Sequence, residues 1–181
     1  MTSFGNLLYG NTLFHLEETN IYGIYESDSY MAWNIEMFPS GEDNYIMFNS
    51  LVIDNIFSPK QLNGKTFKET SDAADLYEHT VKVNGEDRFL KSVEMTFSNW
   101  DTENQSLHLN GHGTILEDDN FPEVIYKFYA ILKFQGLNIF ETTQRETQQF
   151  IDTCLQDVKD KLEIKFENVA SGLTAIISGQ F

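Results

Sequence analysis

The chain has 181 residues, a length that suits one domain with a hydrophobic core of its own, so we expect residues 1–181 to form a single domain. Apolar residues make up 41% and aromatic residues 14% of the chain, which excludes a disordered polar chain despite a net charge of −16. That charge repels phosphate backbones and anionic lipid surfaces, so it disfavours binding to nucleic acid or to a membrane.

Most of the N-terminal half shows apolar and polar side chains in alternation, the pattern of β-strands. The segment 45–53 is apolar on both faces, as expected of a strand buried between two layers. Turn-forming residues at 39–44 predict a hairpin between this strand and the one before it. The predicted strands here are 13–16, 21–25, 30–38 and 45–53.

The same alternation continues through the middle of the chain. Asn84 and Gly85 adopt positive φ angles at low cost, so they predict a tight turn between two strands. Successive strands joined by such turns form an antiparallel meander. The predicted strands in this part are 77–83, 89–97, 106–116 and 124–134.

One helix is predicted near the C-terminus. Thr143 and Glu146 have the spacing of a capping box, in which each side chain accepts a hydrogen bond from a backbone N–H at the helix start. Apolar residues then recur every four positions and predict one buried stripe; they are Phe150, Cys154, Val158 and Leu162. Alternating residues at 162–166 and 173–178 predict a closing hairpin.

These elements together predict a mainly β fold of the α+β class. We expect an antiparallel β-sandwich or partly open barrel, with one amphipathic helix at about 143–160 and a terminal β-hairpin after it. The only cysteine, Cys154, has no partner for an intrachain disulfide, and the sequence shows no secretion signal or apolar span. We therefore expect a cytoplasmic protein.

No motif in the sequence specifies a reaction, a metal or a cofactor. His108 and His112 lie on one face of a predicted strand, but about 13 Å apart, too far to share one ion. Cys154 on the apolar stripe is expected to be an inert core thiol. Phosphate-binding loops and nucleophile motifs are absent from the sequence, so we predict no catalytic, metal or cofactor site.

The distribution of charge is the most informative feature for function. Neither residues 1–59 nor residues 92–126 contain Lys or Arg. Carboxylates and aromatic residues at the edges of strands there could form one protein-binding surface. Trp33, in contrast, is expected in the core. The candidate partner-binding residues are Glu17, Glu18, Glu26, Asp28, Tyr30, Glu42, Asp43, Trp100, Glu117, Asp118 and Asp119.

These features favour a non-catalytic acidic domain that binds a cationic protein partner. Inhibitors and bacterial immunity proteins, which neutralise a toxin or nuclease, share this general character: they are small, acidic and without catalytic motifs. Two other hypotheses stay open. One is a small-molecule-binding barrel closed by the helix, and the other is an enzyme whose site is assembled only in space. The sequence leaves the oligomeric state open.

Overall fold

The computed structural model describes residues 4–25, 30–41, 43–53, 56–70, 79–115, 123–170 and 172–181. In these ranges eleven strands form one sheet, accompanied by two α-helices and a short 3-10 turn. The first strands are β1 (Gly5–Tyr9), β2 (Thr12–Tyr25), β3 (Met31–Pro39), β4 (Tyr45–Val52), β5 (Thr66–Thr70) and β6 (Thr80–Val83). The others are β7 (Glu86–Asp101), β8 (Ser106–Ile115), β9 (Val124–Ile139), β10 (Leu162–Val169) and β11 (Gly172–Gly179). The helices are α1 (Pro59–Leu62) and α2 (Gln144–Cys154), and the 3-10 turn is Lys159–Lys161.

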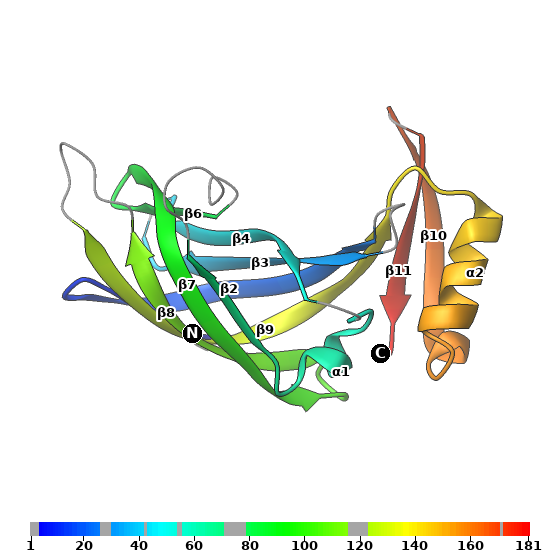
Figure 1. The fold of residues 1–181 in the computed structure, drawn as a ribbon, viewed down its shortest axis with the longest axis horizontal. Coiled ribbons are helices and arrows are strands. Elements are labelled where there is room, and N and C mark those ends of the chain that lie inside the picture. The colour runs from blue at the N-terminus through cyan, green and yellow to red at the C-terminus, as the bar shows by residue number, and fades with distance from the viewer. Residues whose placement is uncertain are drawn as a thin grey trace.

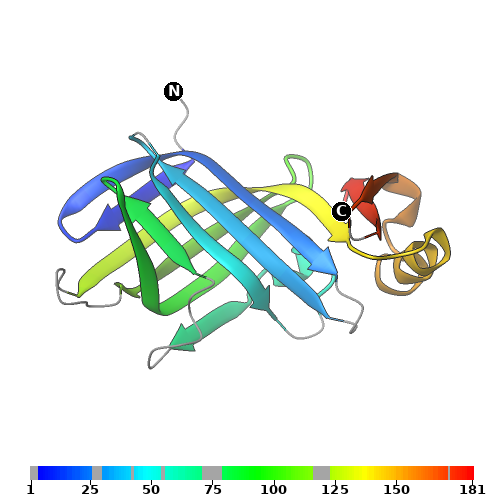
Figure 2. The same ribbon diagram turned by 90° about the horizontal axis from the view of Figure 1, so that it is seen from above.

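The sheet curls into a partly closed ring of strands (Figures 1 and 2). Its order runs from β1 and β2 through β3, β4, β6, β7 and β8 to β9, with β5 attached to β7. β9 then returns to the N-terminal strands, since it pairs antiparallel with β1 and parallel with β2. All other strand pairs in the described chain are antiparallel.

The C-terminal elements extend this sheet beyond the ring. The far end of β9 pairs with β11, where Leu137 lies opposite Ile177, and β11 pairs with β10. Figure 1 shows the β10–β11 hairpin and α2 together at one side of the ring. The aromatic rings of Phe150 on α2 and Tyr25 at the end of β2 have centroids 4.3 Å apart. The helix therefore also contacts the curled sheet.

Large side chains fill the interior of the ring. Trp33, Phe48 and Phe97 are fully buried, which confirms the prediction that Trp33 is a core residue. β7 and the Tyr126 hydroxyl approach Gly113 too closely for any side chain. A Cβ there would collide with a main-chain carbonyl oxygen of β7 and lie 2.6 Å from the Tyr126 hydroxyl. The core therefore depends on a glycine as well as on aromatic rings.

The predicted fold class is confirmed: the protein is mainly antiparallel β, with one amphipathic helix followed by a terminal hairpin. The single curled sheet takes the place of two stacked layers. Asn84 and Gly85 have φ angles of 57° and 83°, as the predicted turn requires. Segments 13–16 and 21–25 belong to one long strand, β2, and the sequence analysis missed β1, β5 and α1.

The predicted helix begins at its predicted cap and ends early. Thr143 Oγ1 accepts a hydrogen bond from the Glu146 N–H at 3.2 Å, and Glu146 Oε2 accepts from the Thr143 N–H at 2.8 Å. Leu155 ends the helix, so Val158 and Leu162 do not lie on it. Among the described residues, no helix has both the length and the apolar character needed to cross a membrane.

Candidate functional site

The outer surface of β2 and β3 carries a group of polar side chains. Along β2 the residues Glu18, Asn20 and Tyr22 alternate with buried residues and therefore face outward. A β-bulge follows Leu16 and exposes Glu17 beside Glu18. Glu36 of β3 lies opposite Asn20 in the register. We call the residues Glu17, Glu18, Asn20, Tyr22 and Glu36 the acidic face.

Neutral donors position two of the three carboxylates of the acidic face, Glu18 and Glu36. Asn20 Nδ2 donates to Glu18 Oε1 at 2.9 Å, and Gln135 Nε2 of β9 holds Asn20 by donating to its Oδ1 at 2.7 Å. The Tyr22 hydroxyl donates to Glu36 Oε1 at 3.2 Å. Burial raises the pKa of the Tyr22 phenol, and the negative charge of Glu36 raises it further. These contacts orient the carboxylates without cancelling their charge.

Cations do not neutralise this face. Within the part of the chain that the structure describes, which includes every Lys and Arg of the sequence, the carboxylates of Glu17, Glu18 and Glu36 form no ion pair. Lys133 lies opposite Asn20 on β9, but its Nζ sits over the Phe4 ring, 5.3 Å from the ring centroid. The acidic face is therefore a surface of uncompensated negative charge.

The second cation-free stretch behaves differently. It adjoins the first because β1 pairs with β9, but lysines from outside the stretch neutralise two of its carboxylates, Glu94 and Glu123. Lys68 lies 3.0 Å from Glu94 and lowers the pKa of that carboxyl, and Lys91 lies 2.6 Å from Glu123. Asp101 accepts hydrogen bonds within its own turn, chiefly from Asn104, which lower its pKa. On β2 and β3, in contrast, none of the three carboxylates Glu17, Glu18 and Glu36 takes part in an ion pair with a described residue.

The predicted partner-binding residues are dispersed. Glu17 and Glu18 lie in the acidic face, and Asp43 is exposed in the turn between β3 and β4. Tyr30, just before β3, is 36% exposed. Trp100 is half-buried, edge-on to Phe134, and its indole N–H is enclosed without a hydrogen-bond partner in the described structure. The remaining candidates lie outside the described residues: Glu26, Asp28, Glu42, Glu117, Asp118 and Asp119.

Sequence reasoning missed Asn20 and Glu36 as members of one surface, and its candidate residues did not include Tyr22. The alternation in 30–38 already placed Glu36 on the polar face of its strand. What the sequence did not provide was the register that sets Glu36 opposite Asn20. The strand could be predicted from its own residues, whereas the shared surface depends on how β3 pairs with β2.

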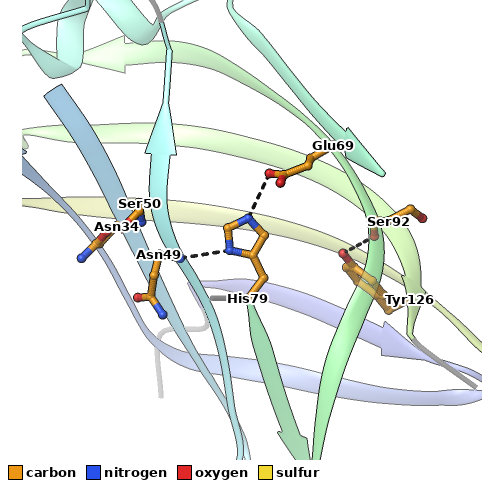
Figure 3. Close-up of polar contacts among 7 residues, drawn as sticks. All are labelled: Asn34, Asn49, Ser50, Glu69, His79, Ser92 and Tyr126. Atoms are coloured by element: carbon orange, nitrogen blue, oxygen red, sulfur yellow. Dashed lines mark hydrogen bonds and ion pairs between the residues drawn. The ribbon is translucent and has the colours of Figure 1, made fainter. Parts of the chain in front are cut away.

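A buried histidine is the strongest candidate for chemistry inside the ring. His79 is 3% exposed; its Nδ1 accepts a hydrogen bond from the Asn49 N–H, and its Nε2 lies 3.3 Å from Glu69 Oε2 (Figure 3). Asn34 Oδ1 accepts from the neighbouring Ser50 N–H at 2.7 Å. His79 and Asn34 thus satisfy two donors of a bulge in β4. Both ring nitrogens of His79 are occupied, so neither is available to a substrate.

The histidines of β8 and the cysteine of α2 lie apart from His79 in the fold. His108 Nδ1 lies 3.1 Å from the Tyr129 hydroxyl, and His112 is exposed on the outer side of β8. Burial raises the pKa of the Cys154 thiol, which favours its unreactive neutral form. In the described ranges, no three residues among His, Cys, Asp and Glu gather closely enough to hold a metal ion.

Comparison with known proteins supplies no relative. No protein-family model matches the chain, and neither the curated proteins nor the solved structures include a significant match. The interpretation of function therefore rests on the surfaces of this molecule.

Proposed function

We propose that this protein is a non-catalytic binding protein whose acidic face recognises a cationic protein. The observation that carries this proposal is that Glu18 and Glu36 are held by neutral hydrogen-bond donors and paired with no lysine or arginine. An oriented carboxylate that keeps its full charge can form a new ion pair without first breaking an old one. Glu94, in contrast, would have to give up Lys68.

The fold supports such a surface physically. The acidic face lies on two adjacent strands whose other side is packed into the core, with Ile21 and Ile35 fully buried beneath it. A rigid sheet keeps the carboxylates at fixed spacing, which lowers the entropy lost on binding. Tyr22 adds an aromatic surface among the charges, a residue type enriched where proteins bind one another.

A toxin or nuclease is the partner class that we favour, which would make the protein an inhibitor or immunity protein of the bacterial cytoplasm. A nuclease binds a polyanion, so its active surface carries lysines and arginines that complement the acidic face. Occupation of that surface by Glu18 and Glu36 would exclude the nucleic acid. The charge would also accelerate association by electrostatic steering.

The experiment begins with capture of partners from a lysate of the native host at low salt, followed by expression of the captured protein. Association rates are then measured at about 0.01 M and about 1 M salt, where the screening length is about 30 Å and about 3 Å. The test variant carries Glu17→Gln, Glu18→Gln and Glu36→Gln. Glutamine keeps an acceptor for Asn20 and Tyr22, so only the charge is removed.

The matched control carries Asp157→Asn, Asp160→Asn and Glu163→Gln, which change net charge equally at exposed positions after α2. We expect the test variant to bind at least about tenfold more weakly, about 1.4 kcal/mol, while the control binds as the parent does. Association should slow strongly with salt only when the acidic face is intact. Equal losses in both variants, or salt-independent association with a neutral partner, would refute the proposal.

A further inference from the structure

A pocket of about 390 Å³ lies where α2 meets the curled sheet. None of its lining residues belongs to the acidic face. Its wall combines the end of β2, the loop after β9 and one side of α2. Three aromatic residues and two carboxylates give the pocket its chemistry: Tyr25, Phe140, Phe150, Glu141 and Glu146. A pocket of this volume suits a small organic molecule.

Local structure explains how these groups converge. β9 ends at Ile139, and Glu141 at a φ of 50° turns the chain toward the cap of α2. Phe140 precedes that turn and remains 42% exposed. Phe150, one helical turn beyond Glu146, packs on Tyr25 with 4.3 Å between ring centroids. The aromatic rings and the carboxylates therefore come from different segments but line the same cavity.

The charge of the pocket selects the class of ligand. Among the described residues that line it, two are carboxylates and none is Lys or Arg, so an anion would be repelled. Glu146 Oε2 already accepts hydrogen bonds from Thr143, which leaves Oε1 for a ligand. Aromatic faces attract organic cations and contribute little to a hard metal ion. The lining therefore complements a positive charge carried on carbon-rich groups.

We propose that this pocket binds a small organic ammonium group. Glu141 and Glu146 supply the opposite charge, and Phe140 supplies an exposed aromatic surface over which the cation packs. The proposal is independent of the acidic face, since none of the residues of that face lines the pocket. Both a free amine and a lysine side chain carry this chemistry.

The test uses the full chain and ligands that differ in charge at constant shape. Calorimetric titration with choline is compared with 3,3-dimethylbutan-1-ol, in which a neutral carbon replaces the ammonium nitrogen. We expect choline to bind at least about tenfold more tightly than the alcohol. Butylammonium and Nα-acetyl-lysine amide then distinguish the sources: tighter binding of the first indicates a free amine, and tighter binding of the second a lysine side chain.

Variants locate the binding. Phe140→Leu and Glu141→Gln alter exposed residues of the pocket, and each should weaken choline binding about fivefold. Glu163→Gln on β10 makes the same charge change outside the pocket and should leave the affinity unchanged. Equal binding of choline and its neutral analogue would overturn the proposal. So would failure of all the ammonium probes to bind, or binding that neither pocket variant weakens.

Discussion

Replacement of His79 by phenylalanine tests whether this histidine is structural. Phenylalanine keeps an aromatic ring between Phe48 and Phe67, whose centroids lie 5.8 and 6.4 Å from that of His79, but it removes both ring nitrogens. The hydrogen bond from the Asn49 N–H to His79 Nδ1 would then be lost, at a cost of about 1–3 kcal/mol. Glu69 is 36% exposed and regains water, so loss of its contact adds little. We expect the free energy of unfolding to fall by about 2 kcal/mol.

Urea denaturation followed by tryptophan fluorescence provides the measurement, because Trp33 is fully buried and lies next to Asn34, which accepts a hydrogen bond from the Ser50 N–H of the bulge. The control is Glu69→Gln, which keeps an acceptor for the His79 Nε2–H and should change stability by less than about 0.5 kcal/mol. The denaturant slope should be the same for both variants. If His79→Phe proves as stable as the parent, the bulge does not need this histidine and the structural role is refuted.

Three further changes test the core, its buried hydroxyl and the helix cap. Burial raises the pKa of the Tyr126 phenol, so above about pH 10 only the unfolded chain releases that proton. The free energy of unfolding should therefore fall as pH rises from about 9 to 11. Urea denaturation at these pH values should show a smaller fall for Tyr126→Phe than for the parent protein. Gly113→Ala places a methyl group against a carbonyl oxygen of β7 and should abolish the folded circular dichroism spectrum, whereas Asn110→Ala, exposed on the same strand, should preserve it. Thr143→Ala removes the acceptor of the Glu146 N–H and should cost about 1 kcal/mol in urea denaturation, most of which Thr143→Ser restores.

Local signals in the sequence predicted those parts of the fold that local interactions determine. The strands 30–38 and 45–53 match β3 and β4 to within one residue at each end, and the Thr143–Glu146 capping box is present. The helix was predicted too long because Val158 and Leu162 continue the spacing of the stripe after the chain has left the helix. Spacing alone cannot distinguish a helical turn from a 3-10 turn that leads into a strand.

The candidate site was predictable only as a region of the chain. Carboxylates without nearby cations in sequence were evident, but the pairing of Glu94 with Lys68 and of Glu123 with Lys91 depends on which strands are neighbours. Those pairs neutralise two carboxylates of the second stretch, whereas Glu17, Glu18 and Glu36 of the first have no ion pair among the described residues. The parallel pairing of β2 with β9 was also beyond local reasoning, since no turn signal joins strands so far apart.

The position of β9 has a consequence for how the protein is made. Gly5 pairs with Ala130, so the ends of the ring meet only after most of the chain has left the ribosome. Contacts this distant along the chain slow folding, because the intervening segment must lose entropy before any of them forms. Until β9 emerges, β2 and β8 each present an edge with unsatisfied backbone groups, which favours pairing with other chains.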